Sequence, residues 1–296
     1  MIQLSIIIIN HNTFSLTCKC IKSIYEFTKK VHFEIILVDN ASSECDADKF
    51  LDIFPQIKLI KSPENVGFAK GNNIGLEYAK GDYILFLNSD IELITDSIAI
   101  CLNKMLSQVD IGVVSPKLIY PDRHLQHIAG RFPSIRYEFV ELCRLHKILG
   151  SKSLLGFYFD HQTETYVDWV WGAFFLTKKT IIEQLPHQKM PDDFFMYFED
   201  VQWCYYIRQL GYKILYTPDT QAIHYVSASS KDTLLESNSR KMQQSLVNER
   251  TFLLKEKGWF YTKILYFLRT LKYLSLRKKN FRKIAKIYWK EFWVFS

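Results

Sequence analysis

The sequence contains few of the residues that interrupt regular structure, with 11 Gly and 8 Pro among its 296 residues. Apolar residues make up 48% of the chain, and no segment is depleted of them. This composition excludes disordered, collagen-like and low-complexity proteins, and no internal repeat points to a repeat array. The length instead suits one large domain of roughly 200–250 residues with an appendage.

Long apolar runs and paired cysteines are also missing. The longest apolar run near the start extends from Leu4 to Ile9, far short of the roughly 20 residues that span a bilayer. Residues 1–3 carry no charge, so the basic segment of a secretory leader is absent. The six cysteines form no CxxC pair, which indicates reduced thiols rather than disulfides or a zinc site. We therefore expect a cytoplasmic protein.

Apolar runs alternate with segments of helical spacing through the first 120 residues. This alternation predicts a βαβαβαβ order and a doubly wound α/β fold, in which helices cover both faces of a mostly parallel sheet. The expected strands are Leu4–Ile9, Glu34–Val38, Ile57–Ile60 and Tyr83–Leu87, and the expected helices are Phe14–Phe27, Asp46–Phe54 and Phe68–Ala79.

Polar side chains follow three of these strands. Asn10-His11-Asn12 follows the first, Asp39-Asn40 the second and Asn88-Ser89-Asp90 the fourth. One such ending would be an ordinary turn or helix cap, but three at one edge of a parallel sheet indicate a polar ligand crevice. The chain has no GxGxxG after the first strand and no GxxxxGK[ST], which disfavours a Rossmann dinucleotide site and a P-loop.

Five segments, taken in order, resemble one known family. They are SIIIINHNT (residues 5–13), VDNAS (38–42), ENVGFAKGNNIG (64–75), GDYILFLNSDIEL (81–93) and a long segment from FFMYFED to AIHY (194–225). They resemble the inverting family-2 glycosyltransferases of the GT-A fold, particularly the rhamnosyltransferase-like branch, over about Gln3 to His224. The resemblance implies transfer of a sugar from a nucleotide diphosphate donor to an acceptor hydroxyl, with Mg²⁺ or Mn²⁺ bound to the diphosphate.

The metal ligands implied by the resemblance are Asp90 and His224. Asp90 directly follows a buried strand, where a carboxylate oxygen suits Mg²⁺ or Mn²⁺, although an Asp there also closes turns. Asn88 stands where many family members carry a further Asp, which leaves one negative charge fewer for the cation. A histidine at a strand end is otherwise often structural.

The general base implied by the resemblance is Asp200, with Glu199 as its orienting neighbour or as an acceptor-binding group. Both begin a predicted helix, where acidic residues also complement the helix dipole. Residues 194–198 are strongly apolar and mostly aromatic. We expect these aromatic side chains to desolvate the carboxylates and to raise their pKa values, which suits a base.

The donor site is expected at the strand ends and at the glycine-containing segment. Asp39 can accept a hydrogen bond from the N3–H group of uracil or thymine, so the nucleotide is UDP or dTDP. His11 stands where the family usually has an aromatic residue that lines the base pocket. Gly67 and Gly71 permit close backbone approach or simply form a turn. The donor-binding candidates are Ile9, Asn10, His11, Asp39, Asn40, Gly67, Lys70, Asn72, Asn88 and Ser89.

The acceptor and sugar pocket is expected around Trp169, Trp171 and Gly172. Two Trp side chains two apart on a strand would point to the same face, where they either stack on a sugar or fill the core. Residues 124–165 match no pattern, and one interpretation is an acceptor-side insertion.

The positive charge of the chain is concentrated near its end. Residues 255–296 contain 12 Lys and Arg against Glu256 and Glu291, interleaved with Trp, Phe and Tyr. Such helices bind anionic membrane surfaces, although a solvated helix pair or nucleic-acid binding would give a similar pattern. We predict a GT-A domain over residues 1–230 and a helical extension over 231–296 that contacts the inner face of the cell membrane, with no nucleic-acid partner.

The predicted activity is the addition of one sugar to a cell-surface glycan precursor. A lipid-linked acceptor is inferred from the family and from the cationic end of the chain. The alternatives are a non-catalytic nucleotide-sugar-binding protein, a nucleotidyltransferase, and a membrane- or nucleic-acid-binding module formed by the basic segment. The nucleotidyltransferase is disfavoured because no glycine-rich basic loop follows the first strand.

Overall fold

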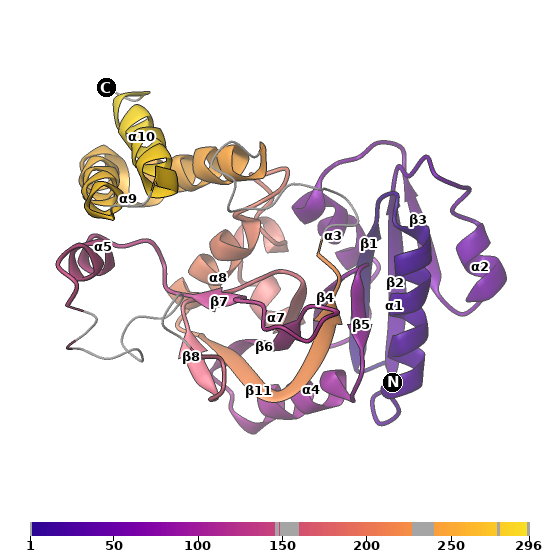
Figure 1. Cartoon of the computed structure of the whole chain (residues 1–296). Helices are drawn as coiled ribbons and strands as arrows, with labels where there is room; N and C mark the ends of the chain where they lie inside the picture. Colours follow the sequence, from indigo (N-terminus) through magenta and orange to yellow (C-terminus); the bar gives the residue numbers. More distant parts are fainter. Residues whose placement is uncertain (1, 146–147, 149–159, 227–239, 277–278, 295–296) are drawn as a thin grey trace. The chain divides into compact units, whose positions relative to one another are not determined.

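A computed structural model describes residues 2–145, 148, 160–226, 240–276 and 279–294 of the chain. The chain divides into two compact units (Figure 1). The first, here called the sheet unit, comprises Met1–Gly130 and Asp160–Lys231, and the second, the helical unit, comprises Arg131–Phe159 and Asp232–Ser296. The helical unit thus takes in residues 131–159 as well as the C-terminal part, whereas the predicted division has a single boundary at residue 230.

The sheet unit is built on a nine-stranded sheet with the order β3-β2-β1-β4-β10-β6-β11-β5, and β8 pairs with β11. The first four strands are parallel to one another, as predicted, and β10 is antiparallel to both of its neighbours. The strand bounds are β1 Leu4–Asn10, β2 Phe33–Asn40, β3 Lys58–Ser62, β4 Tyr83–Asn88, β5 Ile91–Leu93, β6 Ile111–Ile119, β8 Thr165–Val167, β10 Phe174–Lys178 and β11 Lys213–His224.

The helices of the sheet unit follow the predicted order but not every predicted bound. They are α1 Phe14–Phe27, α2 Lys49–Ile53, α3 Phe68–Leu76, α4 Ser97–Ser107, α7 Lys179–Ile182 and α8 Glu199–Gln209, with a short helix η2 at Pro186–Gln188. α2 starts later than predicted because the Asp46 carboxylate accepts the N–H of Asp48 and forms a turn there. α3 ends earlier than predicted because the N–H groups of Tyr78 and Ala79, just after it, bond carbonyl oxygens three residues back, as in a tight turn.

The core of the sheet unit lies along the central parallel strands. Ile6, Ile7 and Ile8 of β1 are fully buried, which explains why this strand reads as a continuous apolar run. α1 turns Cys20, Ile21 and other residues of helical spacing toward the interior. A small second sheet pairs β7 (Ala129–Gly130) with β9 (Trp169–Val170).

The helical unit contains α5 (Ile135–Leu142), α9 (Arg240–Ser275) and α10 (Lys279–Val294). α9 is interrupted at Gly258, whose φ of 81° lies in the left-handed region that favours glycine. Among the described residues, no helix combines the length and the apolar character that a membrane span requires.

A buried ionic network joins α5 to α9 within the helical unit. Arg269 donates to Glu138 at 2.7 Å and to Glu249 at 2.6 Å, and all three side chains are at least nine-tenths buried. Lys272 pairs with Glu138 and also with Glu141. Burial alone would raise the pKa of Glu138, but the charges of Arg269 and Lys272 outweigh it and lower this pKa.

Candidate active site

The parallel strands bring their polar ends to one edge of the sheet, as the sequence predicts. In the strand register Asn10 is opposite Asp39, and Ile9 is opposite Asn88. Ser89 follows directly and shares a hydrogen bond with Thr13 at 3.0 Å. The donor-binding candidates of three neighbouring strands therefore lie together.

The side-chain amide of Asn10 forms four hydrogen bonds at this edge of the sheet. Its Nδ2 donates to Asp39 Oδ1 at 2.7 Å and to Ser42 Oγ at 2.8 Å. Its Oδ1 accepts from the hydroxyl groups of Thr13 and Thr17. Because both donors and both acceptor positions are occupied, Asn10 orients Asp39 rather than offering a polar atom of its own.

His11 and Asn40 position the neighbouring loop. His11 Nδ1 lies 2.9 Å from the carbonyl oxygen of Asn40, which can only accept, so Nδ1 carries the proton. The Asn40 amide donates to Asn65 Oδ1 at 2.9 Å and accepts from the N–H of Val66 at 3.0 Å. The side chain of Asn40 thus fixes the loop that leads into α3.

Gly67 is required by the packing of the chain itself. Its φ is 85°, and a Cβ added there would collide with the carbonyl oxygen of Phe195. That oxygen also accepts the N–H of Phe68 at 2.9 Å, so the loop before α3 is joined to the segment before α8. Packing against Phe195 explains why residue 67 is a glycine, so the turn interpretation accounts for it without a bound ligand.

The remaining α3 candidates differ in exposure. Gly71 lies against Ile9, with 3.4 Å between an added Cβ and the Ile9 side chain. Asn72 is buried and donates to the carbonyl oxygen of Phe68, whereas Lys70 is exposed. Lys70 is therefore the α3 candidate with a charged group accessible to a ligand.

Asp90 and His224 lie next to each other, with 3.2 Å between Asp90 Oδ1 and His224 Nε2. Asn88 is their neighbour, since its Nδ2 lies 3.5 Å from His224 Nε2, and its Oδ1 is buried without a hydrogen-bond partner. No group of three His, Cys, Asp or Glu side chains suited to a metal ion occurs in the described part of the chain. A carboxylate oxygen, an imidazole nitrogen and an orphaned amide oxygen nevertheless fit Mn²⁺ or Mg²⁺.

Glu199 and Asp200 begin α8, which follows two residues in left-handed conformation, Tyr197 at φ 70° and Phe198 at φ 78°. Asp200 Oδ2 accepts the N–H of Gly172 at 3.2 Å, and its Oδ1 accepts that of Val201 at 2.8 Å. These bonds hold the carboxylate in one orientation. Backbone strain of this kind is common at functional sites.

Both carboxyl groups have raised pKa values, as the sequence predicts. Burial raises the pKa of Asp200 to about 6, against the opposing hydrogen bonds from Gly172 and Val201. Burial, together with the nearby charge of Asp200, raises the pKa of Glu199 to about 8. Glu199 Oε2 is buried and has no hydrogen-bond partner among the described residues. The pKa of Glu199 is raised further than that of Asp200, so Asp200 is the carboxyl group of the pair that ionises first as the pH rises.

The two predicted Trp residues do not share a strand. β9 ends at Val170, so the alternation of a strand does not set the direction of Trp171. Trp171 lies edge-on to His224, with 6.2 Å between ring centroids, and the next residue, Gly172, bonds Asp200. Trp169 instead lies over Gly130, with 2.6 Å between its ring and an added Cβ.

Sequence reasoning missed Gln126, a buried residue that bonds His224 through both ends of its amide. It falls in residues 124–165, which match no motif, and a single Gln carries no signal of its own. The predicted role of this segment lies partly outside the described residues, which omit 146–147 and 149–159.

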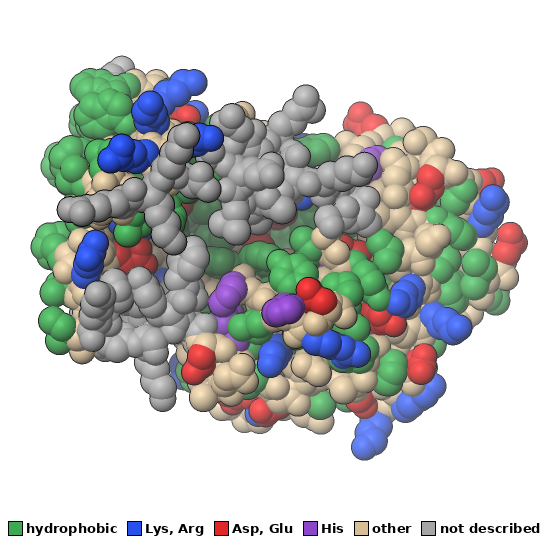
Figure 2. Space-filling view, viewed as in Figure 1, with side chains coloured by type: hydrophobic (Ala, Val, Ile, Leu, Met, Phe, Trp, Pro, Cys, Tyr) green, Lys and Arg blue, Asp and Glu red, His purple; other side chains and the backbone are tan. Residues whose placement is uncertain are grey.

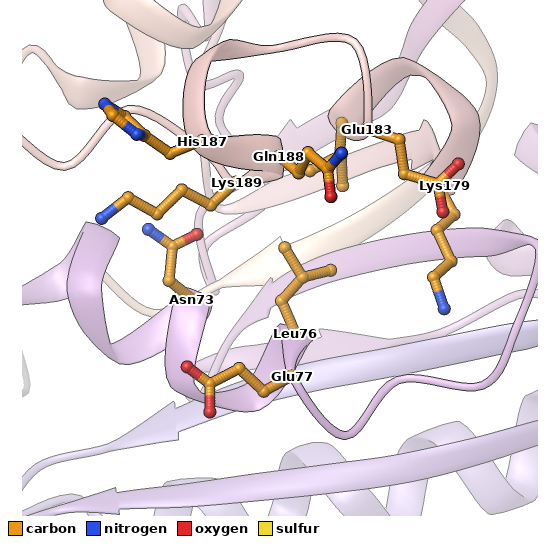
Figure 3. Close-up of a pocket in the computed structure, with 9 residues that line it drawn as sticks. Asn73, Leu76, Glu77, Lys179, Glu183, His187, Gln188 and Lys189 are labelled. Atoms are coloured by element: carbon orange, nitrogen blue, oxygen red, sulfur yellow. The ribbon is translucent and has the colours of Figure 1, made fainter.

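The described residues also enclose a pocket of about 340 Å³ (Figure 3). It is formed by the later part of α3, by α7 and by η2. Its labelled side chains include Asn73, Glu77, Lys179 and Lys189, and none of its lining residues is a predicted site residue.

The sequence pattern of the family described as glycosyl transferase family 2 matches residues 5–184. This match stops before Glu199, Asp200 and His224. Among curated relatives, the rhamnosyltransferase WbbL of Escherichia coli is 24% identical over 87% of this chain and 89% of its own length. The O-antigen biosynthesis protein RfbC of Myxococcus xanthus is 26% identical over 71% of this chain. The chain spans 16% of RfbC and less than a third of two other relatives.

Among solved structures, the mannosyltransferase PcManGT of Pyrobaculum calidifontis, in complex with GDP-Man and Mn²⁺, matches with a TM-score of 0.62. The match covers 98% of this chain and 74% of that one at 16% identity. This similarity confirms the predicted GT-A fold. Since the family pattern covers more than half of the sequence on this fold, the chain belongs to glycosyl transferase family 2.

Proposed function

We propose that the protein is an inverting glycosyltransferase that moves a sugar from a UDP- or dTDP-linked donor to a hydroxyl group of a cell-surface glycan precursor. One observation carries the proposal. The dipeptide Trp171-Gly172 contacts both His224, through the Trp171 ring, and Asp200, through the Gly172 N–H. A candidate metal ligand and a candidate base are therefore held by adjacent residues. The relatives named rhamnosyltransferase and O-antigen biosynthesis protein support the choice of glycan.

In this proposal each group has one task. Asp200 takes the proton of the acceptor hydroxyl as that oxygen attacks the anomeric carbon. Asp39 accepts the N3–H of uracil or thymine. Asp90 and His224, with Asn88, would hold a divalent cation, which when bound offsets the charge that develops on the leaving diphosphate. The structure of PcManGT in complex with GDP-Man and Mn²⁺ supports the choice of metal.

Calorimetric titration with UDP, dTDP and GDP, each with and without Mn²⁺, tests the donor and metal sites. We expect UDP or dTDP to bind, GDP not to bind, and Mn²⁺ to strengthen binding. In Asp90→Asn this strengthening by Mn²⁺ should fall at least about tenfold, because the variant loses the charged ligand. Asp219→Asn is the matched control, since this exposed carboxylate pairs with Lys104 on the surface. Folded wild-type protein that binds none of the three nucleotides would contradict the proposal.

We also propose that the helical unit binds the anionic surface of a membrane, where a lipid-linked acceptor resides. Apolar and cationic side chains lie side by side over α9 and α10 (Figure 2). Residues 255–296 have ten more cationic than anionic residues, which complements anionic lipid headgroups. The exposed large apolar residues there are Trp259, Phe260, Phe267, Leu271, Leu274, Trp289, Trp293 and Val294.

Vesicle sedimentation tests this surface. The wild-type protein should bind vesicles rich in phosphatidylglycerol, bind phosphatidylcholine vesicles weakly, and lose binding as salt is raised. Replacing Phe260 and Trp293 together with Ser should weaken binding at least about tenfold, because each buries a large apolar area in the interface. The paired control replaces Leu51 and Ile53, exposed apolar residues of α2 in the sheet unit. Equal loss in both variants, or preferential binding of RNA, would contradict the proposal.

A further inference from the structure

Gln126 has an unusual set of hydrogen bonds for a buried glutamine. It is 1% exposed, and its backbone N–H donates to the carbonyl oxygen of Leu118 at 3.0 Å. Its side-chain Nε2 donates to the carbonyl oxygen of His224 at 2.8 Å, and its Oε1 lies 2.9 Å from His224 Nδ1. One amide group therefore holds both the backbone and the ring of His224.

These two bonds determine which nitrogen of the His224 ring carries a hydrogen. A carbonyl oxygen can only accept, so the Nε2 group of Gln126 must face it, and Oε1 must then face the ring. Since Oε1 also only accepts, Nδ1 of His224 carries the hydrogen. In a neutral imidazole the lone pair is then on Nε2, the atom that lies 3.2 Å from Asp90 Oδ1 and 3.5 Å from Asn88 Nδ2.

We infer that Gln126 is a positioning residue for a metal-binding His224, an inference that rests on the proposed function. A glutamine that only satisfied the end of β11 would need its bond to the His224 carbonyl oxygen and no other. The second bond selects the tautomer whose Nε2 lone pair is directed into the cluster of Asp90 and Asn88. Groups that orient a ligating histidine in this way typically change metal affinity 10–100-fold when removed.

Mn²⁺ binding, followed by the electron paramagnetic resonance signal of free Mn²⁺ in the presence of UDP or dTDP, tests this role without turnover. Gln126→Met keeps the volume and removes both bonds, and Mn²⁺ affinity should fall at least about tenfold. Gln126→Glu keeps an acceptor for the ring, so its Mn²⁺ affinity should fall less. Thr177→Val is the control, since the hydroxyl group of buried Thr177 donates to the carbonyl oxygen of Gly112, and this variant should bind Mn²⁺ as wild type does.

Two further measurements separate positioning from a merely structural role. In a His224→Ala background, Gln126→Met should cause no additional loss of Mn²⁺ affinity. The ratio of Mn²⁺ affinity to Ca²⁺ affinity should decrease both in His224→Ala and in Gln126→Met, because imidazole suits transition metals and Ca²⁺ prefers oxygen ligands. Folding of each variant is checked by its melting temperature. If Gln126→Met does not fold, the same measurements are made on Gln126→Glu.

The outcomes distinguish this inference from the proposed function. If wild-type protein binds Mn²⁺ with neither nucleotide, the metal site of the proposed function fails. If wild type binds Mn²⁺ and both Gln126 variants bind it equally well, the proposed function stands and Gln126 has no positioning role. Equal losses with and without His224 would also overturn the inference.

Discussion

The Asp200→Asn variant is expected to turn over its donor about 10³-fold more slowly than the wild-type protein, within the range that general-base catalysis contributes. Asn keeps the size of the side chain and one of its two acceptor oxygens, so it can still accept one of the two N–H groups, of Gly172 and Val201, that orient Asp200. It cannot take a proton. The measurement is release of nucleoside diphosphate from the donor, with water as the acceptor, beside calorimetric binding of the nucleotide, which should be unchanged.

The pH dependence of the wild-type protein gives an independent check. Because burial raises the pKa of Asp200 to about 6, the base is ionised above this pH and protonated below it. We expect kcat/KM to fall about tenfold for each pH unit below about 6. Asp219→Asn should show the wild-type rate and profile. An Asp200→Asn variant that keeps more than a tenth of the activity, or a flat profile between pH 4 and 7, would exclude Asp200 as the base.

Replacing Arg269 with Met is expected to destabilise the helical unit by about 3–5 kcal/mol, because buried Glu249 loses its cationic partner and buried Glu138 keeps only Lys272. Glu138 and Glu249 are 7% exposed and both accept hydrogen bonds from this guanidinium group. Hydrogen exchange of the full chain, read by mass spectrometry, should show faster exchange across α5 and α9. Exchange in the strands of the sheet unit should remain as in wild type.

A compensating variant tests whether the cost arises from unpaired charge. Arg269→Met combined with Glu138→Leu and Glu249→Leu removes the carboxylates as well, and it should recover most of the lost protection. Lys286→Met on α10 is the control, since this side chain is exposed and should have little effect. If the single variant Arg269→Met exchanges across α5 and α9 as slowly as the wild-type protein, the network contributes little to stability.

The parallel half of the sheet and its polar edge could be predicted because the signals are local. Predominantly apolar runs such as Leu4–Ile9 identify buried strands, and parallel pairing brings Asn10, Asp39 and Asn88 together without further information. The aromatic residues before Glu199 likewise allowed the raised pKa values to be predicted.

The parts that could not be predicted depend on contacts between distant segments. Gln126 bonds a residue 98 positions away, and Gly67 is dictated by the backbone of Phe195. The different surroundings of Trp169 and Trp171 follow from a strand that ends between them, at Val170. Neither composition nor periodicity carries these facts.

The pairing of α5 with α9 has a consequence for how the protein is made. α5 ends at Leu142 and α9 begins at Arg240, so about a hundred residues separate them. At roughly 5–20 residues per second, a ribosome needs roughly 5–20 s to synthesise this interval. During that time Glu138 and Glu141 have already been synthesised, while Arg269 and Lys272 do not yet exist. A nascent chain stalled before Arg269 would therefore present α5 without its cationic partners, as a site that proteases and chaperones can recognise.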